Sequence, residues 1–169
     1  MFSAAILAIS AAIATLPLGN NSLDWGASEK TLKKSYNVVR AGNGSGRGHG
    51  FTDFNEINPV VYIDKSSPDK KLEFYFHEGK LYKTYTIHLD QKNAETLYEE
   101  KLAERKQKLG KPSKQYIDQL FSLNVLHNVW DFEQEQYELR FGAGYVFEVR
   151  SFKPAAKEKR IEYEMQHAI

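Results

Sequence analysis

Two pairs of short segments in which apolar and polar residues alternate constrain the fold of this chain most strongly. In the first pair, residues 72–77 are followed by residues 81–89, and in the second pair, residues 137–141 are followed by residues 145–150. Alternation with a period of two places successive side chains on opposite faces of a β-strand. Because only a few residues, glycine among them, separate the members of each pair, we expect two antiparallel hairpins.

The position of glycine suggests how the first hairpin turns. A two-residue turn at residues 79–80 has glycine first, as a type II′ turn requires. This turn predicts Phe74 opposite Tyr85 and His77 opposite Tyr82. The apolar residues of both strands would then share one face, and the polar residues the other.

The second hairpin allows a similar prediction. A three-residue loop at residues 142–144 would place Phe141 opposite Tyr145 and Leu139 opposite Phe147. One face of this hairpin would then be apolar, and the other face would carry charged residues from both strands.

The other periodic segments complete the expected fold. Ser28 and Asn93 are suitable helix N-caps, and Gly110 is a suitable helix end. Residues 113–123 also allow a strand, but the spacing of their apolar residues favours a short helix. Strands are expected at residues 60–63, 125–132 and, weakly, at an edge over 160–165, and helices at residues 28–36, 94–109 and 113–123. The sequence therefore predicts an α+β fold, a two-layer sandwich with an antiparallel sheet of about five to six strands and helices on one face.

The first eighteen residues carry no charged side chain, whereas all 23 basic and 22 acidic residues lie beyond them. The apolar run at residues 4–9 is typical of an export signal, and Ala12 and Ala14 supply the small residues that signal peptidase needs. An uncleaved membrane anchor is the alternative, but a span needs about 20 apolar residues and Pro17 interrupts this run. We therefore expect a periplasmic or extracellular protein that touches the membrane only if the signal segment is retained.

These observations divide the chain into four parts. We expect a signal peptide at residues 1–14, a flexible leader at 15–24, the α+β domain at 25–153 and a charged C-terminal segment at 154–169. One domain of this size can bury a single core without a metal or a disulfide.

Composition limits the compartment and the partners. Cysteine is absent, which excludes disulfides, thiolate metal sites, a cysteine nucleophile and the lipid-modified cysteine of a lipoprotein. Small secreted eukaryotic domains usually contain cysteines, so a bacterial exported protein fits better. The net charge is +1, with acids and bases interspersed, so we expect no nucleic-acid partner.

Five glycines alternate with other residues over positions 42–50. A dinucleotide-binding loop would follow a strand and open a helix, but here a helix is expected before the loop. We therefore expect a surface loop. If this loop binds a partner, Arg47 and His49 are its candidate contacts.

Tyrosines on the polar face of the first hairpin form a second candidate surface. Tyr75, Tyr82, His77 and Thr84 are expected there, and amphipathic rings on a concave sheet suit protein or ligand binding. We take Tyr75, His77 and Tyr82 as candidate partner-binding residues. The alternative is that the C-terminal residues of the chain cover this face.

The sequence contains no motif for catalysis or metal binding. The five histidines lack H-E-x-x-H or H-x-H spacing, and the serines lack a G-x-S-x-G elbow. A pair of glycosidase carboxylates depends on distances that the sequence alone does not give. We therefore name no catalytic residue and expect no cofactor and no metal.

Several motifs resemble those of exported bacterial α+β proteins of unknown function. Trp25-Gly26-Ala27-Ser28 followed by Leu32 is similar to their W-G-x-S-x-x-x-[LV] helix start. Residues 76–82 are similar to their F-x-[DE]-G-K-L-Y hairpin, and residues 109–112 to their Y-G-K-P helix stop, with Trp130 on a later strand. The chain is also similar to the β-lactamase-inhibitor-protein-like and BamE/SmpA group, whose members bind proteins, although the lipoprotein cysteine is missing here. The resemblance implies protein binding and supplies no catalytic residue.

Three functions follow as hypotheses. The first is a non-catalytic exported domain that binds a protein or an envelope component through its sheet face or through the loop at residues 42–50. The second is a carboxylate-dependent hydrolase, which a deep pocket with a pKa-shifted acid would favour. The third is a small-ligand carrier with a cavity between helix and sheet.

Export is directly testable. We expect mass spectrometry of the native protein, purified from the periplasmic fraction, to give a chain that begins at Thr15. An intact initiator methionine in a soluble cytosolic pool would contradict the signal peptide.

Overall fold

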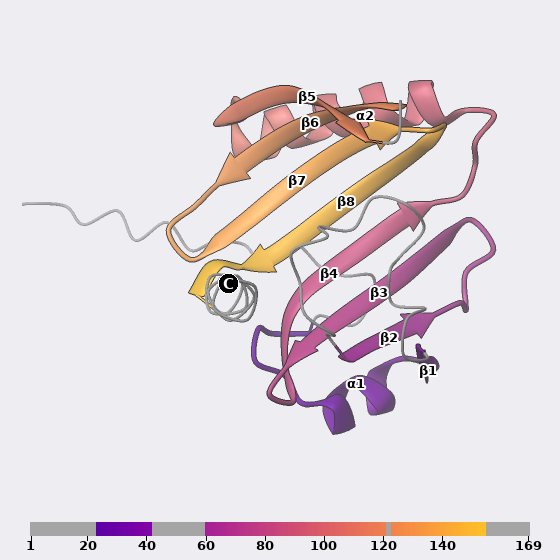
Figure 1. Cartoon of the computed structure of the whole chain (residues 1–169), viewed down its shortest axis with the longest axis vertical. Coiled ribbons are helices and arrows are strands. Elements are labelled where there is room, and N and C mark those ends of the chain that lie inside the picture. The colour runs from indigo at the N-terminus through magenta and orange to yellow at the C-terminus, as the bar shows by residue number, and fades with distance from the viewer. Residues whose placement is uncertain (1–22, 42–59, 121–122, 155–169) are drawn as a thin grey trace, which may run out of the picture.

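The computed structural model describes residues 23–41, 60–120 and 123–154, which form one antiparallel sheet and two helices (Figure 1). The elements in chain order are α1 Glu29–Ser35, β1 Val38–Arg40, β2 Val60–Asp64, β3 Lys70–His77, β4 Lys80–His88, α2 Ala94–Leu109, β5 Lys114–Leu120, β6 Leu123–Asp131, β7 Glu135–Gly142 and β8 Tyr145–Phe152. The strands pair in the order β1-β2-β3-β4-β8-β7-β6-β5. The predicted α+β class with an antiparallel sheet is confirmed, and the sheet has eight strands rather than five to six.

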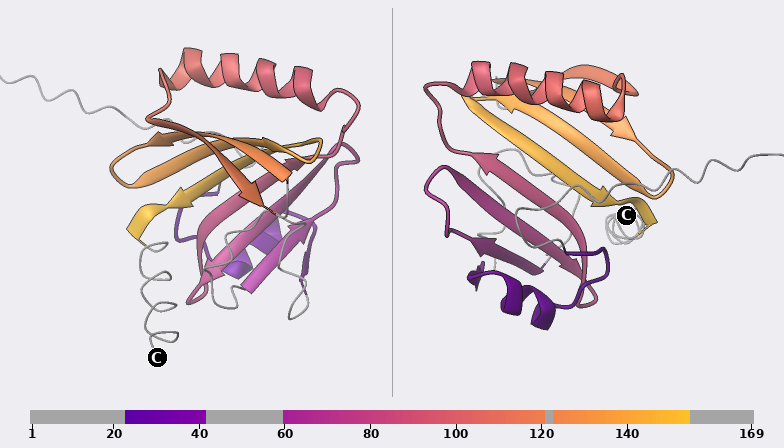
Figure 2. Two further views of the ribbon diagram at one scale, coloured as in Figure 1. Left: turned by 45° about the horizontal axis from the view of Figure 1, so that its top comes forward. Right: turned by 180° about the vertical axis from the view of Figure 1, so that it is seen from behind.

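The sheet consists of two halves with the same organisation. Each half is one helix followed by a four-stranded antiparallel meander, β1 to β4 in the first half and β5 to β8 in the second. β4 and β8 pair antiparallel in the centre, so the halves meet along their last strands. Both helices lie on the same side of the sheet, near its opposite ends (Figure 2, right).

The strand register assigns each side chain to one of two faces. The helix-covered face is defined by a row of paired residues, Tyr62, Phe74, Thr84, Arg150, Tyr137 and Trp130. The opposite face is defined by the next row, Ile63, Glu73, Tyr85, Val149, Glu138 and Val129. Both rows contain buried charged residues.

The turn of the β3–β4 hairpin lies one residue earlier than predicted. Glu78 and Gly79 occupy the turn with φ of 50° and 72°, the pattern of a type I′ turn in which glycine comes second. With this turn alone, Phe74 would lie opposite Lys83. A β-bulge between Tyr75 and Phe76 shifts the register by one residue, so Phe74 lies opposite Thr84 instead of Tyr85. The predicted register was wrong for two reasons: a non-glycine residue adopts the left-handed conformation at the first turn position, and the bulge exchanges the faces of the residues beyond it.

The β7–β8 turn contains two residues, Ala143 and Gly144, rather than the predicted three. Gly142 extends β7 and pairs with Tyr145. A Cβ atom at Gly142 would lie 3.0 Å from Cγ2 of Val125, so the close approach of β6 favours glycine in the strand.

This one-residue difference moves Leu139 opposite Glu148 instead of Phe147. A shift of one residue exchanges the faces of all side chains on one strand relative to the other. Each face of the second half therefore mixes apolar and charged residues, where the sequence had predicted one apolar face.

The segment that was predicted as a short helix at residues 113–123 contains strand β5 instead. β5 pairs with β6 along its whole length, from Lys114 opposite Val129 to Leu120 opposite Leu123. Pairing with a neighbouring strand outweighs the helical spacing of the apolar residues here. The expected weak strand at residues 160–165 lies outside the described residues.

The helices begin and end close to the predicted positions. The Ser28 side chain accepts a hydrogen bond from the Thr31 N–H at 3.2 Å, and Leu32 is completely buried against the sheet. α2 has the predicted bounds, but Asn93 does not cap it with its side chain, which donates to Asp90 instead. No helix in residues 23–41, 60–120 and 123–154 is long and apolar enough to cross a membrane.

Trp25 connects the N-terminal segment to the second half of the sheet. Its indole Nε1 donates to Glu135 at 3.1 Å and its ring stacks on Phe152, while the Arg150 guanidinium lies 5.2 Å from the ring centroid. Arg150 also bonds to Glu135 at 2.6 Å. Trp25 therefore has an intramolecular role in packing, next to the core of α1.

Positive φ at the two turns predicts a gain in stability on substitution. Glu78→Asn and Ala143→Asn should each raise the free energy of unfolding by up to about 1 kcal/mol, because asparagine tolerates the left-handed conformation better than glutamate or alanine. Urea unfolding measures this change. Glu133→Asn, at an exposed residue without positive φ, is the control and should give no gain. Equal effects at all three positions would contradict the explanation.

Candidate functional site

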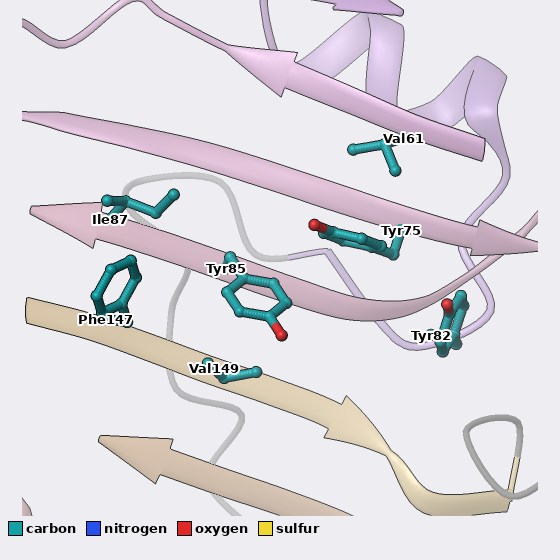
Figure 3. Close-up of a cluster of buried hydrophobic side chains, with 7 residues drawn as sticks. All are labelled: Val61, Tyr75, Tyr82, Tyr85, Ile87, Phe147 and Val149. Carbon is teal, nitrogen blue, oxygen red and sulfur yellow. The ribbon is translucent and has the colours of Figure 1, made fainter. Parts of the chain in front are cut away.

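The structure places the three predicted hairpin residues on the opposite face. Tyr75 and Tyr82 belong to a cluster of buried hydrophobic side chains there (Figure 3), with exposed fractions of 2% and 1%. The half-buried His77 meets the edge of the Tyr82 ring at 6.4 Å. Thr84 was expected beside them but lies on the helix-covered face, because it pairs with Phe74. Arg47 and His49 lie outside the described residues.

Two buried glutamates, one in each half of the sheet, contact the basic side chains of the opposite face. Glu73 accepts a hydrogen bond from Tyr75 at 2.8 Å and pairs with Lys71 at 2.6 Å. In the other half of the sheet, Glu138 contacts both His127 and Arg140. Each of these residues is at most 9% exposed, so their contacts belong to the interior of the protein.

A half-buried glutamate, whose side chain is 11% exposed, lies under α2 on the helix-covered face. Glu148 accepts from Arg105 at 2.6 Å and from Tyr137 at 2.6 Å, and its other oxygen lies 2.9 Å from His88 Nε2. Lys101 lies 3.4 Å away. Because Arg105 and Lys101 come from α2, this cluster fastens the helix to β4, β7 and β8.

These contacts decide the protonation of the carboxyl groups. Burial by itself would raise the pKa of Glu148, but the hydrogen bonds from His88, Arg105 and Tyr137 and the charge of Lys101 hold that pKa well below its ordinary value. Glu138 follows the same pattern: burial raises its pKa, and the contacts with His127 and Arg140 lower it further than burial raises it. Both groups are ionised hydrogen-bond acceptors at neutral pH, and neither holds a proton that it could donate.

An open groove of about 360 Å³ lies between α2 and the β5–β6 pair. We call it the α2–β5 groove; its lining residues are Tyr98, Glu99, Leu102, Gln115, Tyr116, Ile117, Leu126 and Asn128. Aliphatic side chains from all three elements give it apolar walls. A groove of this composition suits an apolar side chain of a partner better than a polar solute.

Asn128 forms the polar floor of the α2–β5 groove. It is 1% exposed, and its side chain donates to the Tyr98 hydroxyl of α2 and accepts from Gln115 of β5. One amide thus connects both walls of the groove. Burial raises the pKa of Tyr98, so its hydroxyl stays protonated at neutral pH.

The rim of this groove carries exposed apolar residues. Ile117 is 67% exposed and Tyr116 is 46% exposed, although both lie in strand β5. Tyr116 stacks on His127 of β6 at 4.5 Å, which holds its ring on the opposite face. Exposed apolar residues next to an apolar groove are typical of an interaction surface.

Sequence reasoning missed this site because it predicted a helix where β5 lies. Residues 114–120 show no alternation of apolar and polar residues, and the signal for a strand was the high β-propensity of Tyr116 and Ile117. The other half of the groove was predicted, since Tyr98 and Leu102 lie on the expected buried side of α2.

A metal site has no support from the described residues. Within 23–41, 60–120 and 123–154, no three histidine, aspartate or glutamate side chains are arranged to hold an ion. His88 and His127 each contact a glutamate instead.

The fold and the groove define an α+β protein with a continuous eight-stranded antiparallel sheet and an apolar surface groove. Comparison with models of protein families, with curated proteins and with solved structures found no match. The function is therefore inferred from the geometry of the fold and of the groove.

The Glu148 cluster generates a prediction for acid stability. The pKa of this group lies below its unfolded value of about 4.3, so its contribution to stability is complete above that pH and is lost as the pH falls below it. Glu148→Gln should cost about 3 kcal/mol at pH 7, because buried cations lose their counter-charge. The variant should also lose less stability than the wild type between pH 5 and pH 2 in urea unfolding.

Glu100→Gln is the matched control. Glu100 is exposed on α2, so its loss should cost at most about 0.5 kcal/mol. Similar costs for both substitutions would show that the Glu148 cluster does not fasten α2.

Proposed function

We propose that this chain is a non-catalytic exported bacterial domain that binds another protein, and that an apolar segment of that protein docks in the α2–β5 groove. The observation that carries the proposal is the groove itself, with its apolar walls and the exposed Ile117 at its rim. Interface cores combine aliphatic and aromatic contacts with a few polar groups. Asn128 and Gln115 supply such polar groups here.

The residues at the rim indicate which chemical groups the partner segment carries. Glu99 is the acidic residue on the lining of the groove, and it is exposed on α2. An apolar side chain followed by a basic residue would satisfy both the groove and this carboxylate. The partner segment is therefore expected to carry this combination.

Export remains part of the proposal. It is supported by the uncharged first eighteen residues. The absence of cysteine favours a bacterial over a eukaryotic exported protein. A periplasmic or extracellular protein, or a protein of the cell envelope, is the corresponding partner.

The other two hypotheses have less support among the described residues. Glu138 and Glu148 are ionised and saturated by cations, which is unsuitable for a general acid. Between α2 and strands β7 and β8, buried side chains such as Tyr137, Leu139 and Val146 pack against the helix, where a carrier would need an enclosed cavity.

Site-specific photo-crosslinking in the native compartment tests the groove. A photoreactive amino acid in place of Glu99 should form an adduct with one other protein, whereas the same amino acid in place of Lys108 should not. Lys108 is the matched control because it is exposed on the far side of the same helix. Mass spectrometry of the adduct should locate a partner segment with an apolar side chain next to a basic one.

Two outcomes contradict the proposal. Equal adduct yields at both positions would mean that the groove is not a specific site. Glu99 adducts that contain a second copy of the chain and no other protein would mean that the groove does not bind another protein.

A further inference from the structure

The two ends of the sheet differ in a way that points to a second interaction. In the described part of the chain, the sheet ends at β1, which has 3 residues, and at β5, which has 7 residues. Short edge strands resist pairing with other chains, and long ones invite it. All side chains from Lys114 to Gln119 are exposed. The outer edge of β5 is therefore the place where the sheet can be extended.

We propose that β5 pairs antiparallel with β5 of a second copy of this chain, with Tyr116 on the two-fold axis. In this register, Lys114 lies opposite the partner's Asp118, and by symmetry Asp118 lies opposite the partner's Lys114. The result is a dimer with one continuous sheet through both copies.

Backbone geometry restricts the registers that two identical strands can adopt. The N–H and C=O groups of alternate residues point to opposite edges of a strand, and in an antiparallel pair the residues that point outward must face each other. The numbers of two facing residues therefore have an even sum. One residue of β5 must consequently lie on the axis and face its own copy.

The charges of β5 select among the remaining registers. With Asp118 on the axis, two carboxylates would face each other, and with Ile117 on the axis, Lys114 would have no acidic partner. With Tyr116 on the axis, the Lys114–Asp118 pair forms twice, once on each side of the axis. This register alone pairs each charged side chain of β5 with its opposite.

The same register relates the dimer to the α2–β5 groove. Gln115 lines the groove and would lie opposite the partner's Ile117, which places a further apolar side chain beside the groove. A two-fold axis perpendicular to the sheet also leaves both α2 helices on the same face. The dimer thus goes beyond the proposed function, since it would bring two grooves side by side without filling them.

Disulfide cross-linking tests the register directly. The chain contains no cysteine, so Tyr116→Cys introduces the single thiol of the protein, at the position that faces itself. Facing residues in antiparallel strands are close enough for a disulfide. Mild oxidation should convert Tyr116→Cys into a covalent dimer, and Ile117→Cys, one position further along, should react at least tenfold more slowly because it faces Gln115.

Charge reversal tests the pairing without a covalent link. Analytical ultracentrifugation over a concentration series should give a monomer–dimer equilibrium for the wild type. Lys114→Asp and Asp118→Lys should each raise the dimer Kd at least tenfold, since each creates two like-charge contacts. The double reversal, Lys114→Asp with Asp118→Lys, restores the pairs with exchanged signs and should return the Kd to near the wild-type value.

A wild-type chain that sediments as a monomer at all concentrations would overturn the proposal. The proposal would also be overturned if Ile117→Cys cross-linked as fast as Tyr116→Cys. The same holds if the dimer Kd of the double reversal were as high as that of the single reversals. These outcomes are independent of the proposed function, because a monomer can still give the Glu99 adduct with another protein, and a dimer can form without such an adduct.

Discussion

The antiparallel pairing of β4 with β8 is the interaction on which the rest of the structure depends. It joins two helix-plus-meander halves into one sheet, from Lys83 opposite Ser151 to His88 opposite Val146. It also fixes the position of α2, because Glu148 of β8 accepts hydrogen bonds from that helix and contacts His88 of β4. Trp25 adds a second connection, since it links the N-terminal segment to Glu135 of β7. The orientation of the α2–β5 groove relative to the first half follows from these contacts.

Charged residues are buried on both faces of this sheet, whereas a two-layer sandwich commonly has one face exposed to solvent. Glu73, Glu138 and Glu148 lie in different parts of the sheet, and each contacts at least one cation. Isolated buried charges cost several kcal/mol, and paired ones cost far less. The pairs Lys71–Glu73 and Glu138–Arg140 each lie within one strand and do not depend on the register. Glu138 also contacts His127 of β6, and Glu148 contacts His88 of β4 and Tyr137 of β7, so a slip by one residue would separate these cross-strand partners. The cross-strand contacts therefore favour the observed alignment.

Sequence reasoning predicted the elements better than their alignment. Residues 94–109 carried a clear helical periodicity and residues 60–63 an apolar run of strand-forming residues, and the helix and the strand formed there. Both hairpin registers were wrong: the first has an earlier turn and a β-bulge next to Phe76, and the second has a two-residue turn where a longer loop was expected before Tyr145. A choice between neighbouring registers depends on contacts with distant strands, which no local pattern contains.

The candidate site was missed for a related reason. Its α2 wall was predicted from the buried stripe that includes Tyr98, but its other wall depends on β5, whose pairing with β6 overrides helical spacing. Tyr75 and Tyr82 were predicted as partner-binding residues because they are aromatic residues on a face that was expected to be exposed to solvent. In the structure they are packed in a core cluster, because the sheet has two buried faces.

The meander organisation of each half has a consequence for how the protein folds. Within a half, every strand pairs with the one next to it in the chain, so most contacts have low contact order and can form early. The central seam is different, because its two strands belong to separate halves and enclose a long loop when they meet. Assembly is therefore expected to end with the docking of two preformed meanders, and this late step sets the rate at which the native state appears.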